Sequence, residues 1–159
     1  MAPGESPFGL VPSLLDRLIA PDADGTAWRR GFGIEQVRDA IRRDLEDLLN
    51  THRSHPDLPP GFEELINSVF TYGMPDPSSL SAMAQKPGEI SRAIAEVIDR
   101  FEPRLRDIDV RVVDQPDVHH RRIRFQIEAR FRIEPFSDVE FETVLELSSG
   151  HTSIEPAGA

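Results

Sequence analysis

Histidine pairs are the first residues in this sequence whose types and spacing suggest chemistry. His52 and His55 are three residues apart, the spacing that places two imidazoles on one face of a helix, where they could share a metal ion. Pro56 follows directly, so this stretch is expected to be a helix end, and we interpret both histidines as facing solvent. His119 and His120 are adjacent, and adjacent strand residues point to opposite faces. We therefore predict no metal site.

The motifs of the common enzyme classes do not occur in this sequence. There is no nucleophile elbow, phosphate-binding loop or zinc-protease motif, and there is no cysteine. Gly31-Phe32-Gly33 begins like a dinucleotide fingerprint but has Gln36 where the third glycine belongs. Carboxylates are abundant, yet a glycosidase needs two of them flanking a cleft, whereas most here fall on polar faces. We predict a protein that is not an enzyme and that needs no cofactor.

The segment Phe101-Glu102-Pro103-Arg104-Leu105 stands out because it lies where a helical pattern gives way to a strand pattern. In one interpretation Pro103 only stops the helix, Leu105 packs, and the two charged residues sit on the surface. In the other, a turn fixed by proline presents a carboxylate and a guanidinium to a partner, since a guanidinium makes bidentate bonds. The residues alone leave both interpretations open.

Four helices are expected to precede this corner, over 12–19, 34–52, 61–72 and from Pro87 to about Glu102, because apolar residues recur there every three or four positions. In the third helix Gly73 is expected to close the last turn, and the predicted buried face consists of Phe62, Leu65, Ile66, Val69 and Phe70. Residues 22–33 are expected to form a loop, and residues 74–79, with two prolines, to be irregular.

After the corner the apolar pattern alternates, which predicts strands over 107–112, 122–133, 139–147 and 151–154, with turns between them. Placing the centre of the 122–147 hairpin at Phe136 pairs Ile127 with Leu145, and Arg130 and Arg132 with glutamates. The arginines are then explained as cross-strand partners of acids. The expected fold class is α+β: amphipathic helices from the N-terminal two-thirds of the chain pack on a C-terminal antiparallel sheet of three to four strands.

Length and charge limit the class of protein further. With 159 residues the chain is the size of one domain, predicted over 10–155 between flexible tails at 1–9 and 156–159. A net charge of −10 argues against binding to nucleic acid or to an anionic membrane surface. No apolar run is long enough to insert into a membrane, and the first residues carry no secretory signal, so a cytoplasmic location is expected.

Four segments, in this order and spacing, resemble TssE, the baseplate wedge subunit family of bacterial type VI secretion systems, which is similar to the small wedge protein of contractile-tailed phages. These segments are Ser13-Leu14-Leu15-Asp16-Arg17-Leu18, Arg43 to Thr51, Ser68 to Asp76, and Phe101 to Leu105. The resemblance covers most of the chain. It implies a structural subunit of a baseplate that assembles at the inner membrane.

The resemblance also implies which residues meet partners. It implies that the subunit docks on the wedge proteins TssF and TssG. The residues it assigns to partner binding are Leu48, Leu49, Asn50, Glu102, Pro103, Arg104 and Leu105. A short last strand would leave a free sheet edge, where strands of the sheath proteins TssB and TssC are expected to add. Two alternatives stay open: a regulatory binding module like the anti-adaptor IraD, and a peptidoglycan hydrolase.

Overall fold

A computed structural model describes residues 34–53, 61–83, 86–113, 122–132, 138–146 and 148–156. The expected helix over 12–19, the loop over 22–33 and the turn near residue 116 lie outside the described residues. The elements are α2 (Ile34–Asn50), α3 (Glu63–Ile66), the 3-10 helix η2 (Val69–Thr71), α4 (Pro77–Met83), α5 (Pro87–Phe101), β1 (Leu105–Val112), β2 (Arg122–Phe131), β3 (Asp138–Glu146) and β4 (Thr152–Pro156).

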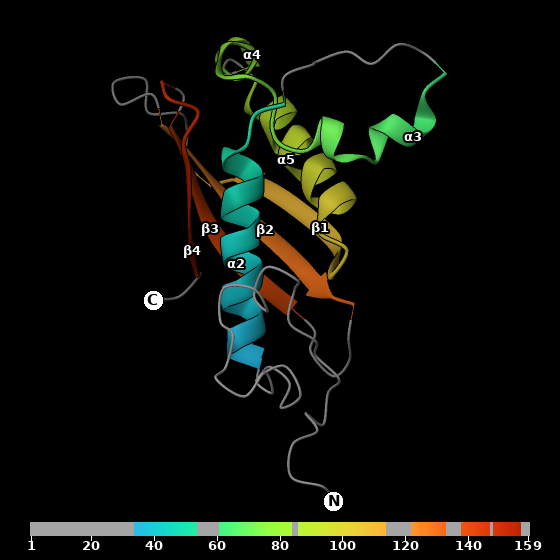
Figure 1. Cartoon of the computed structure of the whole chain (residues 1–159). Helices are drawn as coiled ribbons and strands as arrows, with labels where there is room; N and C mark the ends of the chain where they lie inside the picture. The colour runs from blue at the N-terminus through green and yellow to red at the C-terminus, as the bar shows by residue number, and fades with distance from the viewer. Residues whose placement is uncertain are drawn as a thin grey trace, which may run out of the picture.

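The strands form one antiparallel sheet in the order β1-β2-β3-β4, and two helices cover one of its faces. Figure 1 shows α2 and α5 on the same side of the sheet, and α5 runs along β1 while α2 runs along β4. The core lies between these layers, and its fully buried members include Ile41, Leu45, Ile90, Ile98, Phe125, Ile127 and Phe141. The predicted α+β class is confirmed.

The two long helices form where the apolar spacing predicts them. In α2 the buried residues recur every three or four positions: Val37, Ala40, Ile41, Leu45, Leu48 and Leu49. α5 begins at Pro87, whose missing N–H costs nothing in a first turn, and it carries Glu89 near its start and Arg100 near its end, where each charge favours the helix dipole. Both helices therefore agree with their sequence signals, except that α2 ends at Asn50, two residues before the predicted end.

The strands also form as predicted, but the predicted register of the hairpin is wrong. Ile127 lies opposite Phe141 rather than Leu145, and Arg130 lies opposite Asp138 rather than Glu142, a displacement of four residues. An even displacement leaves every side chain on its predicted face, so the alternation of apolar and charged residues does not distinguish the two registers. β4 runs from Thr152 to Pro156 and thus includes the first residue of the predicted C-terminal tail.

The predicted third helix is the largest error. Residues 62–71 form only the four-residue α3 and the three-residue η2, and the face predicted to be buried is exposed instead. In Figure 1 α3 projects away from the two layers. The side-chain hydroxyl of Thr71 donates to the carbonyl oxygen of Ile66 at 2.6 Å, which holds the chain in a tight turn where a continuous helix was expected. We call residues 62–70 the apolar arm.

Gly73 has the predicted positive φ, 102°, but for a different reason. It lies against the end of α2, where Met74 N–H donates to Thr51 O at 2.7 Å and Arg53 N–H donates to Met74 O at 2.9 Å. A Cβ on residue 73 would collide with the carbonyl oxygen of Thr51, so glycine is needed both for φ and for this close approach.

The expectation that residues 74–79 are irregular is wrong for the last three of them, because α4 starts at Pro77. Asp76 caps this helix: its Oδ1 accepts the backbone N–H of Ser78 at 2.9 Å and that of Ser79 at 3.2 Å. The serine hydroxyls and amides that bond to the carboxylate lower the pKa of Asp76. An aspartate cap followed by proline is a helix-start signal that outweighed the proline-rich composition.

Candidate assembly interface

The helix-to-strand corner is the first place where the predicted site residues come together. α5 ends because Pro103 excludes the helical conformation at Glu102, which has φ −114° and ψ 82°. Glu102 N–H still donates to Ile98 O at 2.8 Å, and Leu105 N–H donates back to Glu102 O at 3.2 Å. The chain therefore turns from helix to sheet within three residues, with the exposed Pro103 at the outside of the turn.

The charged side chains of this corner bond to each other and to α2. The Arg104 guanidinium donates from Nε to Glu102 Oε1 at 2.6 Å and from Nη2 to Asp44 Oδ2 at 2.6 Å, and Nη2 also contacts Glu102 Oε2. The Glu102 side chain is 5% exposed and that of Arg104 is 28% exposed. An ion cluster of three residues therefore joins α2 to the corner, with one guanidinium between two carboxylates.

The charges of this ion cluster change the pKa of Arg104, which belongs to it, and of the nearby Tyr72. Burial alone lowers the pKa of Arg104, but the hydrogen bonds and charges of Glu102 and then Asp44 raise it more, so this guanidinium stays charged. Tyr72 packs edge-on against Phe101, with ring centroids 5.2 Å apart. Burial, and then the negative charges of Asp47, Asp44 and Glu102, raise the pKa of the Tyr72 phenol.

The predicted partner residues divide into three groups by exposure. Leu48, Leu49 and Leu105 are core residues, at 2%, 1% and 0% exposure. Glu102 and Asn50 are used inside the chain: Glu102 binds Arg104, and the Asn50 carboxamide binds the backbone of Thr152 in β4. Pro103 is exposed, and Arg104 is partly exposed, as Asn50 also is.

Two contacts at these sites have no signal in the linear sequence. Asp44 is 60 residues from Arg104, and Thr152 is 102 residues from Asn50. Neither pair follows a local periodicity, so only the packing of α2 across the corner and beside β4 brings them together. The sequence identified one member of each pair but not its partner.

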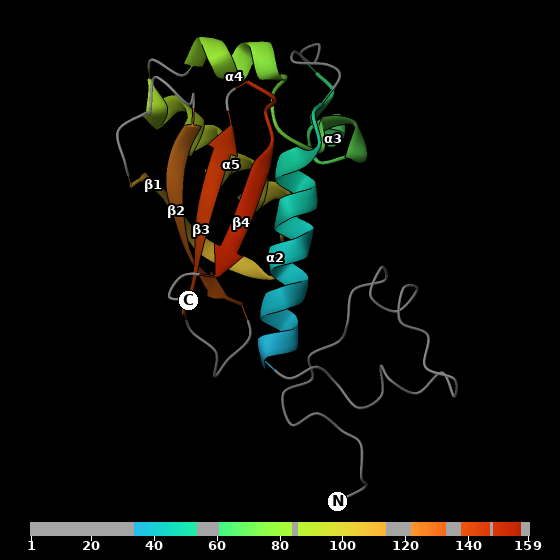
Figure 2. The same ribbon diagram turned by 90° about the vertical axis from the view of Figure 1, so that its left-hand side faces the viewer.

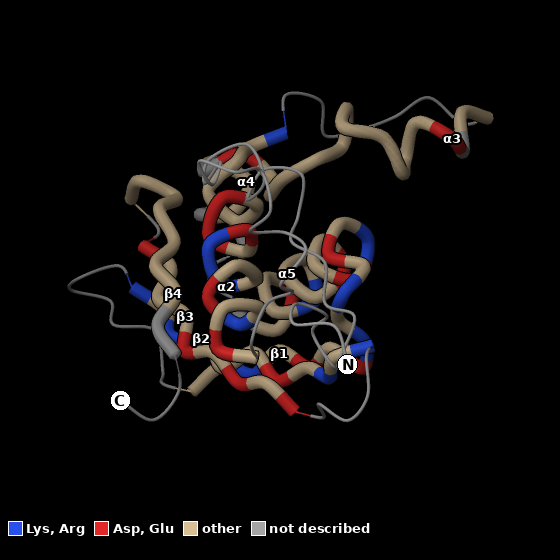
Figure 3. Tube along the Cα trace, turned by 60° about the horizontal axis from the view of Figure 1, so that its bottom comes forward, with Lys and Arg blue, Asp and Glu red and all other residues tan. Residues whose placement is uncertain are grey.

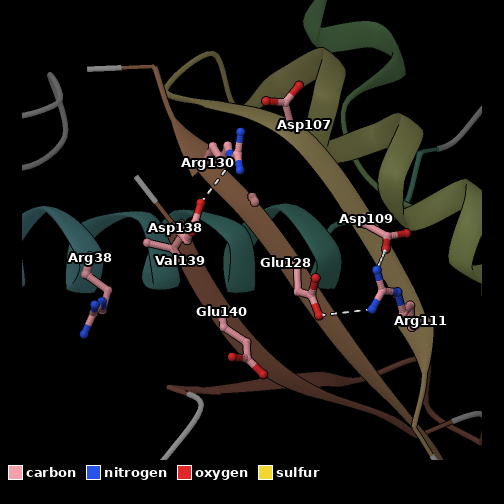
Figure 4. Close-up of a pocket in the computed structure, with 10 residues that line it drawn as sticks. Arg38, Asp107, Asp109, Arg111, Glu128, Arg130, Asp138, Val139 and Glu140 are labelled. Atoms are coloured by element: carbon pink, nitrogen blue, oxygen red, sulfur yellow. Dashed lines mark hydrogen bonds and ion pairs between the residues drawn. The ribbon is translucent and has the colours of Figure 1, made fainter. Parts of the chain in front are cut away.

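The sheet face away from the helices is charged, and most of its charges are paired. A shallow depression of about 560 Å³ opens there, lined mainly by arginines and carboxylates of β1, β2 and β3 (Figure 4). Arg111 contacts Asp109 at 2.5 Å and Glu128 at 3.4 Å, and Arg130 contacts Asp138 at 3.0 Å. The arginines thus serve as partners of neighbouring acids, as the alternation predicts.

The apolar arm is the main exposed hydrophobic surface that sequence reasoning missed. Val69 is 88% exposed, and the other large apolar residues of the arm are 36–56% exposed: Phe62, Leu65, Ile66 and Phe70. Figure 3 shows that α3 carries acidic residues and that the chain beyond it is almost free of charge. Large exposed apolar patches mark interaction surfaces in proteins, so these side chains make the arm a candidate contact surface.

The described part of the chain offers no group of three or more His, Asp or Glu side chains that could hold a metal ion. His52 donates from Nδ1 to the carbonyl oxygen of Pro75 at 3.1 Å, so it ties the α2 end to the segment before α4. His151 is exposed. His55, His119 and His120 lie outside the described residues. None of the described helices is both long and apolar enough to cross a bilayer.

The sequence model of the baseplate wedge protein gp25 matches residues 35–135, more than half of the chain. The chain belongs to the baseplate wedge protein gp25 family. The matched part of this gp25-family chain runs from the start of α2 past the end of β2, so it contains Asn50, the apolar arm and the Glu102–Arg104 corner. The sequence-based prediction of a baseplate wedge subunit is confirmed at the level of the family.

Among solved structures, the gp25-family chain is similar to a chain of the baseplate complex from the type VI secretion system. The two share 20% identity with a TM-score of 0.46, and the similarity covers 69% of this chain and 94% of that chain. Among curated protein sequences, none matches significantly.

Proposed function

We propose that this chain is the structural wedge subunit of a type VI secretion baseplate, and that it docks on TssF and TssG and helps to start assembly of the contractile sheath. The observation that carries the proposal is the match of the gp25 wedge family over residues 35–135. In this role the chain acts in the cytoplasm, within a complex assembled at the inner membrane, and it transforms no substrate.

The surface of the protein supports a role in protein–protein contact. The apolar arm exposes five large apolar side chains, which a soluble monomer keeps out of water where it can. The corner adds Pro103 and the outer part of Arg104, whose position is fixed by Glu102 and Asp44. We propose that the TssF–TssG wedge covers both surfaces. Leu48, Leu49 and Leu105 contribute by holding α2 and the corner in place, since they are buried.

Sheath assembly is proposed to start at the outer edge of β4. This strand is last in the sheet order, so none of the described strands lies on its outer side. An extended segment of TssB or TssC can pair there through main-chain hydrogen bonds. The opposite edge is less suited to addition, because β1 is interrupted by a bulge between Arg106 and Asp109, and Asp107 within it has a φ of 53°.

Co-expression with candidate partners tests the proposal. The tagged full chain is expected to co-elute in size-exclusion chromatography with TssF and TssG from the same gene cluster. Arg104→Lys, which keeps the charge but loses the planar fork, is expected to weaken co-elution, while Arg100→Lys at the exposed end of α5 leaves it unchanged. A stable complex with a response regulator instead would favour the anti-adaptor function, and clearing of a peptidoglycan suspension would favour a hydrolase. Either result without TssF–TssG binding contradicts the proposal.

A further inference from the structure

Two hydroxyl groups, rather than a continuous helix, fix the shape of the apolar arm. In a continuous helix the carbonyl oxygens of Leu65 and Ile66 would each accept the backbone N–H four residues further on. In the structure the Ser68 hydroxyl donates to Leu65 O at 2.8 Å, and the Thr71 hydroxyl donates to Ile66 O at 2.6 Å. The hydroxyls therefore occupy these carbonyl oxygens, and α3 ends at Ile66.

The same two residues hold the second half of the arm. Ser68 caps η2, because its Oγ accepts the N–H of Phe70 at 3.2 Å. Thr71 is 3% exposed, and its own N–H donates to Ser68 O at 3.1 Å. The buried Thr71 thus anchors the backbone that carries the exposed Val69. A segment held in this way loses less conformational entropy on binding than a mobile one does.

The arm lies where a partner can reach both it and the helix-to-strand corner. Figures 1 and 2 show α3 beyond the C-terminal end of α2 and outside the two layers. Where the arm joins the rest of the chain, Tyr72 packs against Phe101, the residue directly before Glu102 of the corner. The base of the arm and the corner are therefore in contact, so one partner can cover both.

The charges of the arm indicate the chemistry of that partner. Residues 61–83 include three acids and no lysine, arginine or histidine, and Glu64 is an exposed acid of α3. At the base of the arm, burial and then the negative charges of α2 and the corner raise the pKa of Tyr72. Opposite charges across an interface favour association, whereas like charges disfavour it. A basic surface therefore fits the arm, and a second copy of this chain, with a net charge of −10, fits poorly.

We propose that the apolar arm, held in its broken shape by the hydroxyls of Ser68 and Thr71, binds in an apolar pocket of the TssF–TssG wedge whose rim carries lysine or arginine. This inference rests on the proposed function, because it takes the partner to be that wedge. Thr71 and Ser68 are positioning residues: they hold the arm in shape, and the apolar side chains and Glu64 contact the partner.

Removal of the Thr71 hydroxyl tests the fixed shape. Thr71→Val keeps the size of the side chain but leaves Ile66 O without its donor, so the affinity for TssF–TssG is expected to fall by about three- to tenfold. Thr71→Ser keeps the hydroxyl and is expected to bind as the wild type does. Ser68→Ala, at a partly buried position without core packing, is the second variant and is expected to weaken binding in the same way.

Biolayer interferometry on the immobilised full chain, with purified TssF–TssG in solution, measures these affinities, and urea unfolding shows that each variant is folded. Equal affinities of the wild type, Thr71→Val and Ser68→Ala would overturn the positioning role. Equal weakening by Thr71→Ser and Thr71→Val would also overturn it, because the loss would then follow the packing of residue 71 and not its hydroxyl.

The association rate tests the basic rim. Glu64→Gln is expected to lower the association rate constant by about threefold and to make it less sensitive to KCl between about 50 and about 300 mM, because a rim charge acts mainly on this rate. Asp39→Asn is the matched control, since it removes an exposed acid from the first half of α2, away from the arm. If the two variants give the same rate and salt dependence, the basic rim is wrong.

The wild-type chain distinguishes failure of this inference from failure of the proposed function. If it does not bind TssF–TssG, the proposed function is contradicted and the named partner with it. If it binds but the arm variants bind equally well, the wedge role stands and the arm is not the contact. If the free chain sediments as a dimer that Val69→Glu converts to a monomer, the arm binds a second copy, and the inference is overturned.

Discussion

Arg104 and Asp44, 60 residues apart in the sequence, are joined by a hydrogen bond of 2.6 Å from Nη2 to Oδ2. The same guanidinium binds Glu102, whose side chain is 5% exposed. Since a carboxylate so deeply buried needs a partner, the bond to Arg104 is part of what keeps the corner folded. The corner that the family resemblance assigns to partners is therefore also a structural joint between α2 and the sheet.

Removal of Arg104 is expected to destabilise the fold strongly. Arg104→Ala leaves Glu102 buried without its cation, which typically costs about 3–5 kcal/mol. Urea unfolding followed by circular dichroism measures this loss. Arg100→Ala, which removes an exposed arginine at the end of the adjoining helix, is expected to change the free energy of unfolding by less than about 0.5 kcal/mol. Equal effects of the two variants would contradict the structural role of the cluster.

Titration of Tyr72 reports on the charge of the same region. It is the only tyrosine of the chain, so the tyrosinate absorbance follows it alone. Its pKa is expected above the ordinary value of 10.0, because of burial first and of the nearby acids second. Asp47→Asn removes the acid that raises this pKa most among the three and is expected to lower the pKa of Tyr72. Asp39→Asn, an exposed acid two turns earlier in α2, should leave it unchanged.

The raised pKa also sets a pH dependence of stability. The folded state holds the phenol proton more tightly than the unfolded state, so the contribution of Tyr72 is complete below the unfolded pKa near 10 and is lost as the pH rises through the folded pKa. Wild-type stability is therefore expected to fall in alkaline solution by more than that of Tyr72→Phe. Parallel stability curves for the two proteins above pH 10 would contradict this expectation.

Alanine substitutions at three glycines distinguish the cost of a positive φ from the cost of a steric clash with the added Cβ. Gly73→Ala meets both a φ of 102° and the Thr51 carbonyl, so it is expected to cost more than about 1 kcal/mol. Gly61 has a φ of 98° but open space around it, so Gly61→Ala is expected to cost only the backbone strain, without a clash. Gly88→Ala lies in the first turn of α5 with nothing nearby and is expected to be neutral or to stabilise by up to about 1 kcal/mol. Thermal unfolding should rank the variants in this order.

The sequence was sufficient to predict α2, α5, the first three strands and their buried faces, because each has a regular apolar period, and it also placed the short last strand, though without a buried face. It was not sufficient for the hairpin register, since two registers an even number of residues apart bury the same side chains. The apolar arm shows a second limit. The spacing of Phe62, Leu65, Ile66 and Val69 indicates that these residues favour burial, but it does not distinguish burial in their own core from burial against a partner.

The candidate site was predictable only in part for a related reason. The corner could be located because Pro103 breaks a helix at a change of period, and Asn50 because the family resemblance includes it. Their bonding partners Asp44 and Thr152 could not be, since these contacts depend on how α2 packs across the sheet. Tertiary contacts over such distances leave no trace in a single sequence.

The apolar arm is expected to bind partners without stabilising the isolated chain. Val69→Glu places a charge on a side chain that is 88% exposed, so the free energy of unfolding should change by no more than about 0.5 kcal/mol. The same charge would be buried in a complex without a partner, so co-elution with TssF and TssG is expected to fall by at least about tenfold.

Val113→Glu is the matched control for this prediction, because Val113 is also an exposed valine, at 54%, but lies at the end of β1 outside the arm. It should leave both stability and co-elution unchanged. If Val69→Glu co-elutes as well as Val113→Glu, the arm is not a contact of the wedge. If instead Val69→Glu unfolds the isolated chain, the arm packs against this chain's own residues in solution, and its exposed apolar face has a structural origin.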